Sequence, residues 1–283
     1  MTTEDISVWF PVVITELLLI LMINAITIIA FARIRHLRKR STYLIINLTV
    51  ADLLVGAVAG PLIIYHEDKE SNGFTWSGLI YPAIELIFPV ASQVNLSLIS
   101  LERLHAALFP FRHCVITKWL YLKIIVGSWL VILLIAFVMP ILPQVAFPYS
   151  WASFSAVTLL IQAFCYVMII VNVERSPHSD QRGSIHMERK LSITLLMVTG
   201  VSVLTILPYA VYNSMPVDLQ QEVANRSGVE IKALLAVIYL ASSIVNPLVY
   251  AIRMQEFRKA LWNLVCKITE PTRVIPLQPH AMP

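Results

Sequence analysis

The sequence predicts an all-α membrane protein: a bundle of seven transmembrane helices followed by a short amphipathic eighth helix. The chain is 58% hydrophobic and 13% charged, with a mean hydropathy of +0.75, whereas a soluble domain holds roughly 25% charged residues. Seven segments each offer the ~20 mainly apolar residues that a spanning helix needs. Lys and Arg gather in alternate connections between these segments. Ten-residue alternating strands are absent from the sequence, which argues against a β-barrel.

The expected spans follow one another along the chain with mostly short connections. They cover residues 8–32, 42–65, 78–105, 119–142, 152–173, 188–214 and 230–252. After the last span, Phe257, Leu261 and Leu264 share a helical face beside Arg258 and Lys259. This pattern predicts a helix that lies on the inner leaflet.

The spans divide the chain into three regions. Residues 1–7 form a short extracellular N-terminus, residues 8–267 form the bundle with the eighth helix, and residues 268–283 form a disordered cytoplasmic tail. Of the 21 Lys and Arg residues, 18 fall on one side of the spans, and only Lys69 and two others fall on the opposite side. The basic side is therefore expected in the cytoplasm, which gives a multi-pass protein of the cell membrane with its N-terminus outside.

The positions of the cysteines and histidines limit which disulfides and metal sites the chain can form. Cys114, Cys165 and Cys266 fall in an inner loop, a span and the C-terminal region. None lies in a segment placed outside, so we expect no extracellular disulfide. The histidines are scattered and show no metal-binding spacing, so no metal is expected beyond a sodium ion.

Asp52 lies ten residues into the second span, ~15 Å deep. A carboxylate at that depth is costly unless it is paired, protonated or bound to a cation. Polar side chains on other spans offer partners: Asn24, Ser92, Asn95, Ser242, Ser243 and Asn246. We interpret this set as a polar cluster that binds a small cation such as sodium, the one candidate cofactor. A hydrogen-bonded structural Asp is the alternative.

An ionic switch is predicted where the third span ends. Arg103 can pair with Glu102 on its own helix or reach Glu188, which opens the sixth span. The contact with Glu188 would make a breakable latch between the third and sixth helices; the alternative is an interfacial Arg that reaches lipid phosphates.

Two prolines add candidate hinges to this switch. Pro208 and Pro247 each remove a helical hydrogen bond within a span. Tyr166 and Tyr250 lie where their hydroxyls could share a water once the switch opens. For each proline taken singly, a static kink is the alternative.

Glu85 is a second acid within a span, ~27 Å along the same helix from Arg103. Its depth suits a counter-ion for a cationic ligand group in the outer half of the bundle. The alternative is an internal bond with Gln162 or Tyr239.

Taken together, these residues resemble the rhodopsin-like (class A) G protein-coupled receptors, over nearly the whole chain and with about one motif per helix. The matching positions are Asn24, Leu48-Thr49-Val50-Ala51-Asp52, Glu102-Arg103-Leu104, Trp129, Tyr166, Pro208 and Asn246-Pro247-Leu248-Val249-Tyr250. The resemblance implies a non-enzymatic receptor that binds an extracellular ligand and activates a heterotrimeric G protein.

The resemblance also assigns residues to two surfaces. In the outer half, the ligand site would comprise Glu85, Pro89, Ile206, Tyr209, Asn213 and Tyr239. At the inner face, the G protein would contact Arg103, Pro110 and Phe111. Membrane lipids are further expected partners, and nucleic acid is not.

Departures from the usual pattern favour one branch of this family. Gly78 stands where a third-helix cysteine is usual, and Thr158 replaces the fifth-helix proline. This pair of changes is similar to the melanocortin, lysophospholipid and cannabinoid receptors, with the adenosine receptors as relatives. Glu85 matches the acid of amine receptors, so the ligand stays open among lipid, amine, nucleoside and peptide. Ile206 and Ser202 replace residues of the sixth-helix switch.

The altered switch leaves two other functions open: a receptor-like protein without ligand-driven signalling, and a transporter. Two modifications are also predicted. Cys266 follows the amphipathic segment and suits palmitoylation, and Asn225-Arg226-Ser227 is a glycosylation sequon in a segment placed outside.

Overall fold

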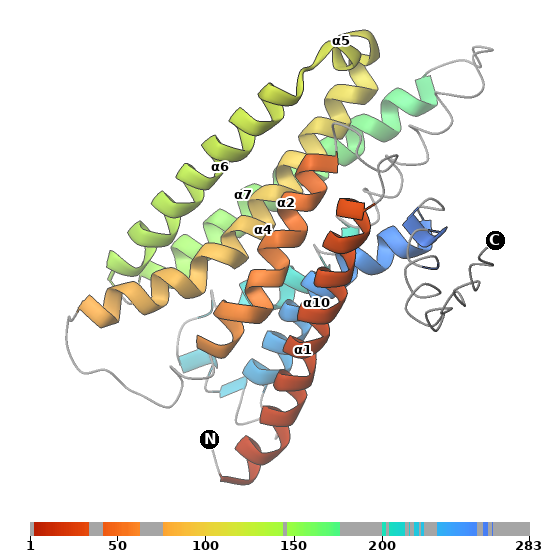
Figure 1. Cartoon of the computed structure of the whole chain (residues 1–283). Coiled ribbons are helices and arrows are strands. Elements are labelled where there is room, and N and C mark those ends of the chain that lie inside the picture. The colour runs from red at the N-terminus through yellow and green to blue at the C-terminus, as the bar shows by residue number, and fades with distance from the viewer. Residues whose placement is uncertain are drawn as a thin grey trace, which may run out of the picture.

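The computed structural model describes residues 3–33, 42–62, 76–143, 146–175, 200–201, 204–212, 215, 218–220, 222–223, 231–253, 257–259 and 262. These residues are almost entirely helical and form a bundle of long helices that run side by side (Figure 1). Six of the described helices are long and apolar enough to cross a membrane. The predicted all-α membrane class is confirmed.

The helices succeed one another in the predicted order. The first is α1 (Thr3–Arg33), followed by α2 (Thr42–Leu54), which continues into the π-helical turn η2 (Val55–Ala59). Next come α4 (Trp76–Leu108), the short α5 (Pro110–Val115), α6 (Lys118–Val138) with the 3-10 turn η3 (Met139–Ile141), α7 (Ala146–Arg175) and α10 (Ile231–Arg253).

Three of the expected segment boundaries differ from the structure or are described in it only in part. Helix α1 starts at Thr3, so it includes most of the stretch assigned to a separate N-terminus. The expected span 188–214 is described at 200–201 and 204–212, where it is helical. Helical residues also occur at 257–259 and 262, within the predicted eighth helix, while the predicted tail 268–283 lies outside the described residues.

Helix α4 is the centre of the bundle. It packs against α2, α6 and α7, and α10 lies against α1 and α2 (Figure 1). We call the end of the bundle at which α1, α4 and α10 finish the basic end, because Arg33, Arg103 and Arg253 lie there. Helix α5 caps α4 at this end.

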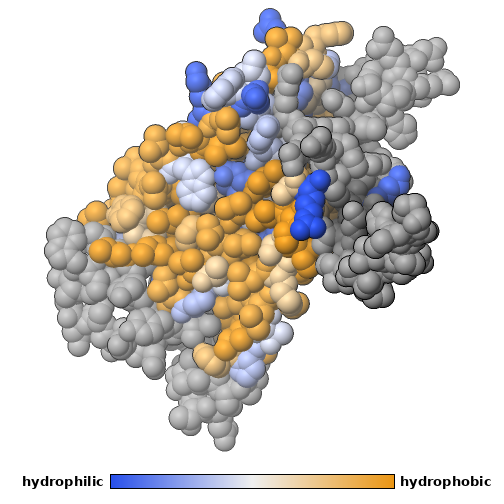
Figure 2. Space-filling view, in the orientation of Figure 1, coloured by the Kyte–Doolittle hydropathy of each residue, from blue (hydrophilic) through white to orange (hydrophobic). Residues whose placement is uncertain are grey.

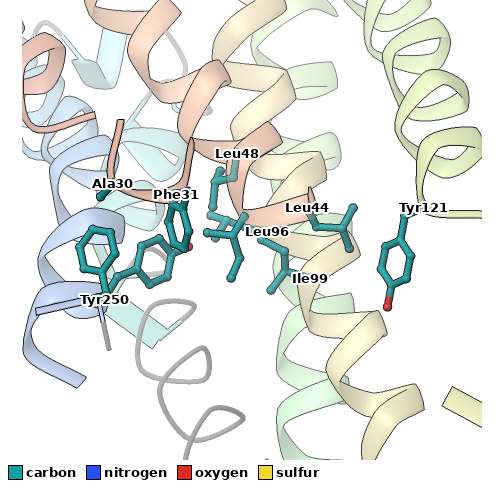
Figure 3. Close-up of a cluster of buried hydrophobic side chains, with 10 residues drawn as sticks. Ala30, Phe31, Leu44, Leu48, Leu96, Ile99, Tyr121 and Tyr250 are labelled. Carbon is teal, nitrogen blue, oxygen red and sulfur yellow. The ribbon is translucent and has the colours of Figure 1, made fainter. Parts of the chain in front are cut away.

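An apolar cluster fills the bundle near the basic end (Figure 3). The Phe31 and Phe257 rings lie 5.2 Å apart, and Tyr250 meets Phe257 edge-on at 6.5 Å. Phe257 is 1% exposed, so the eighth-helix segment is anchored to α1 and α10 by this ring. In lipid such helices associate through close van der Waals packing, because the surroundings are as apolar as the core.

The outer surface is apolar over most of its height. Figure 2 shows a broad hydrophobic face, with hydrophilic residues gathered toward the basic end. Large exposed side chains on α6 and α7 include Leu130, Leu134 and Leu160, each more than 60% exposed. A soluble monomer does not expose an apolar surface of this extent, so this face suits the lipid interior.

Gly56 allows the π-helical turn to approach α1 closely. A Cβ at this position would lie 2.9 Å from Ile20 Cγ2 and 3.1 Å from the Leu17 backbone oxygen. Ile20 is fully buried and β-branched, so it has little freedom to move away. Gly127 on α6, by contrast, has nothing within 4 Å of an added Cβ.

We therefore expect Gly56→Ala to destabilise the protein by about 1–3 kcal/mol, the usual cost of overpacking a core. The midpoint of thermal unfolding in detergent micelles measures this effect. Gly127→Ala is the matched control, because it adds the same methyl group in open space. Equal midpoints for the two variants would show that the α1 contact is not tight.

Candidate functional site

Asp52 lies at the junction of three helices. Its Oδ1 accepts hydrogen bonds from Ser92 Oγ at 2.6 Å and Ser243 Oγ at 3.2 Å, and its Oδ2 accepts one from Asn246 Nδ2 at 2.7 Å. The Asp52 side chain is 1% exposed. We call these four residues the Asp52 cluster. Donors from α4 and α10 thus compensate a buried carboxyl group on α2.

Other expected partners of Asp52 take different positions. Asn24 donates to the backbone oxygens of Ile20 at 2.9 Å and Ser243 at 3.1 Å, so it joins α1 to α10. Ser242 lines the cavity beside the cluster. The placement of Asn95 in this cluster needs correction, because its side chain is turned to another partner.

Asn95 belongs to a second polar junction, between α2, α4 and α6. Asn47 Nδ2 donates to Asn95 Oδ1 at 2.6 Å, and Trp129 Nε1 donates to Asn47 Oδ1 at 3.0 Å. Asn95 Nδ2 in turn donates to the Ala91 backbone oxygen at 2.8 Å. Asn47 was not among the residues singled out from the sequence.

A narrow cavity, with about 10 Å³ of space for the centre of a water molecule, connects the Asp52 cluster to the ligand positions expected from the sequence. Pro89, Ile206 and Tyr239 line it together with Asp52. The Tyr209 and Tyr239 rings stack with their centroids 4.8 Å apart. Four of the six expected ligand residues therefore lie in or directly against one cavity, and Asn213 lies outside the described residues.

Glu85 lies on α4 one helical turn from Pro89, toward the end of the bundle opposite the basic end. It is half-buried. Its alternative partner Gln162 is engaged elsewhere, because Gln162 Nε2 donates to Ser97 Oγ at 3.2 Å. The position of Glu85 above the cavity is thus compatible with contact to a bound ligand.

A buried polar seam between α4 and α7 was not expected. Thr158 Oγ1 lies 3.2 Å from Gln93 Oε1, and Gln93 also lines the cavity. Gln93, Thr158 and Gln162 are all less than 7% exposed. The signal in the sequence was Thr158 in place of proline, which leaves a hydroxyl facing α4.

Glu102 gathers partners from three elements near the basic end. Arg103 Nε lies 2.7 Å from Glu102 Oε2, Tyr121 on α6 donates to Glu102 Oε1 at 2.9 Å, and His113 Nε2 on α5 lies 3.3 Å from the same oxygen. His105 Nδ1 lies 3.5 Å from His113 Nδ1. We call these five residues the Glu102 cluster. The sequence pointed to the pair of Glu102 and Arg103 but not to the other three.

The structure describes some of the expected switch residues and not others. Pro208 lies in the described helical stretch 204–212, and Pro247 lies inside α10. Tyr250 is fully buried, whereas Tyr166 is 40% exposed. The Tyr250 hydroxyl has no hydrogen-bond partner among the described residues, so the two tyrosines do not bond in this conformation. Glu188, Cys266 and Asn225 lie outside the described residues.

The fold and these junctions describe a membrane-spanning bundle of helices with a buried polar core and an ion pair near its basic end. Residues 23–250 match the family described as 7 transmembrane receptor (rhodopsin family). This match covers well over half of the chain, so the protein belongs to that family. It is a G protein-coupled receptor and not an enzyme, as the sequence predicted.

Amine receptors are among its relatives. The chain is 26% identical to the histamine H2 receptor of Rattus norvegicus over 300 residues, which covers 93% of this chain and 81% of that protein. It is 37% identical to dopamine receptor 2 of Drosophila melanogaster over 93 residues, 32% of this chain and 17% of that receptor. It is 36% identical to the histamine H4 receptor of Mus musculus over 80 residues, 28% of this chain and 20% of that receptor.

The matches to dopamine receptor 2 and the histamine H4 receptor span less than two thirds of those proteins. The match to the histamine H2 receptor spans most of that protein. These relatives do not support the melanocortin, lysophospholipid, cannabinoid and adenosine branch that the sequence favoured. That interpretation relied mainly on Gly78 and Thr158, which replace the usual cysteine and proline. The shared loss of two residues is weak evidence of common descent.

We expect Trp129→Phe to lower the stability of the receptor by about 1–2 kcal/mol, because it leaves Oδ1 of the half-buried Asn47 without its indole donor. The thermal unfolding midpoint measures the loss. Trp119→Phe is the matched control, since Trp119 is 65% exposed. A Trp129 variant as stable as the Trp119 variant would argue that the junction of α2, α4 and α6 adds no stability.

Proposed function

We propose that this receptor binds a small cationic amine and that Glu85 is its counter-ion. The observation that carries the proposal is the placement of one acidic side chain a helical turn from a cavity lined by Tyr239, on which Tyr209 stacks. A carboxylate neutralises an ammonium group, and aromatic faces attract the same cation. Lipid, nucleoside and peptide ligands are the alternatives that a ligand panel must test.

The dimensions favour a compact ligand. Glu85 and Pro89 are four residues apart on α4, or ~6 Å along the helix axis. An ammonium group held by Glu85 therefore leaves the rest of a small molecule within reach of Tyr239 and Ile206, which line the cavity below. The names of the relatives, dopamine and histamine receptors, point to molecules of this size and charge.

We assign a sodium ion to the Asp52 cluster in the resting state. A carboxylate with two serine hydroxyls and an asparagine side chain offers the oxygen ligands that a hard cation prefers. Asp52 and its three partners border the same cavity as Pro89 and Tyr239, which supports access for a small ion. Ligand and ion then act on opposite ends of one polar region.

The basic end is the proposed site of G protein coupling and faces the cytoplasm, with the N-terminus outside. The excess of Lys and Arg there supports this orientation. Phe111 on α5 is 89% exposed and Pro110 precedes it at the start of the same helix, close to the Glu102 cluster. An agonist that moves the receptor from 1:99 to 99:1 active needs ~5.5 kcal/mol of differential affinity, more than any one ion pair supplies.

Glu85→Gln tests the ligand class. We expect the potency of a cationic agonist from a panel of dopamine, histamine and related amines to fall about 10- to 100-fold, the effect of removing one partner of a buried charge pair. The readout is nucleotide exchange on a purified G protein. Glu16→Gln is the matched control, because Glu16 is a buried acid on α1 outside the cavity lining. If a neutral lipid or nucleoside activates both forms equally and no amine does, the amine assignment is wrong.

Asp52→Asn tests the ion. In the parent receptor we expect sodium to lower agonist affinity at least about fivefold, the lower range for coupling between two sites. The variant should lose this dependence because it lacks the carboxylate charge. Agonist displacement in sodium chloride is compared with the same assay in potassium chloride. A parent receptor indifferent to sodium would remove the cation from the account.

A further inference from the structure

Glu102 is shared between three structural elements at the basic end. We propose that His113 of α5 is a positioning residue that competes with Arg103 for Glu102, and that protonation of His113 frees Arg103 and fastens α5. The proposal rests on the receptor's coupling to a G protein but not on the identity of its ligand.

The contact between Arg103 and Glu102 is short but poorly directed. The two residues are neighbours on α4, and adjacent side chains on a helix do not face each other. Arg103 Nε lies 2.7 Å from Glu102 Oε2, yet it makes no aligned hydrogen bond among the described residues. Charge attraction, rather than a well-formed bond, therefore holds Arg103 in place.

The second carboxylate oxygen of Glu102 faces the two groups that compete with Arg103. Glu102 Oε1 accepts the Tyr121 hydroxyl at 2.9 Å and lies 3.3 Å from His113 Nε2. Neutral His113 contributes an ordinary hydrogen bond at this separation. A protonated imidazole makes a charge-assisted bond that is shorter and about twice as strong. A second cation on the carboxylate also weakens the pull of Glu102 on Arg103.

His105 gives the proton a place. With Nε2 of neutral His113 donating to Glu102, its Nδ1 accepts from His105 Nδ1, 3.5 Å away. When Nδ1 of His113 takes a proton from the cytosol, that nitrogen becomes a hydrogen-bond donor. His105 can then adopt its other tautomer, with the proton on Nε2, so that its Nδ1 accepts the bond. One positive charge therefore fits the pair without loss of the contact, while a second charge would be repelled.

The surroundings of His113 have both signs of charge. Within the described residues, the charged and titratable groups around it come from α4, from α5 itself and from α6: Glu102, Arg103, His105, Arg112 and Tyr121. His113 is 16% exposed at its side chain, so water can deliver the proton. Histidine is the side chain that changes charge between about pH 5 and 8.

Protonation has a consequence for coupling. Freed Arg103 is available to a partner, and α5 is held more firmly against α4 while it presents the exposed Phe111. Acidification on the cytoplasmic side is thus expected to raise basal signalling. The expected increase is about fivefold, which corresponds to the difference in free energy between a charged and a neutral hydrogen bond.

The test uses the full-length receptor in lipid nanodiscs with a purified G protein and no agonist. Basal nucleotide exchange is measured from pH 6 to 8 for the parent, His113→Gln and His113→Arg, each normalised to Lys118→Gln, which changes an exposed residue at the start of α6. We expect the parent to rise about fivefold on acidification. The Gln variant should remain low and flat, and the Arg variant should remain high and flat.

A second readout needs no G protein. Hydrogen–deuterium exchange of residues 110–115, corrected for intrinsic rates, should slow at low pH in the parent and not in His113→Gln. Tyr121→Phe should lower basal exchange at every pH, because Glu102 loses a competing donor and attracts Arg103 more strongly. Parallel pH profiles for the parent and His113→Gln in both assays would overturn the proposal, and they would leave the amine assignment untouched.

Discussion

The structure depends on the carboxyl group of Asp52. A charge or an acid in the interior of a membrane bundle is costly unless its surroundings replace water. Here three donors do so, two serine hydroxyls and one asparagine amide, and they come from α4 and α10. Because these bonds join three helices at one point, a change in the charge or partners of Asp52 acts on α2, α4 and α10 together.

Helix α4 connects this point to both ends of the receptor. Glu85 lies near its beginning, Ser92 and Gln93 at its middle, and Glu102 near its end. The cavity passes from the level of Pro89 down to Asp52. One helix thus has contact with the proposed ligand, the polar core and the proposed G protein surface, which gives a physical path between them.

The two ends use different chemistry for related tasks. At the Asp52 cluster, neutral donors surround one carboxyl group, so an added cation changes the balance strongly. At the Glu102 cluster, a carboxylate already has one cation, Arg103, and a titratable neighbour, His113. The first arrangement suits an ion from the outer side, and the second suits a proton from the inner side.

The apolar lengths alone predicted the class of fold, because a membrane span is defined by length and hydropathy. The depth of Asp52, Glu85 and Arg103 was equally predictable from residue counts along each helix. The rotation of each helix about its own axis could not be predicted in this way. Ser92 and Asn95 lie three residues apart, so ~60° separates them around α4, and that is enough to turn Asn95 to Asn47 and Trp129 instead of Asp52.

Contacts between distant segments were the other limit. Tyr121 and His113 approach Glu102 only because α5 folds back onto α4 and α6 begins beside it. Nothing in the spacing of these residues indicates that approach. The branch of the family was misjudged for a related reason: residues that are missing from a pattern carry less information than residues that interact.

The central claim is that bonds to Asp52 hold one arrangement of α4 and α10 and that signalling exchanges it for another. Spin labels at two exposed positions near the basic end, Leu101 on α4 and Ile252 on α10, report their separation directly. We predict that the distance distribution gains a second resolved population when a nucleotide-free G protein binds. A single distribution, unchanged by the G protein and by every agonist that activates it, would contradict the account.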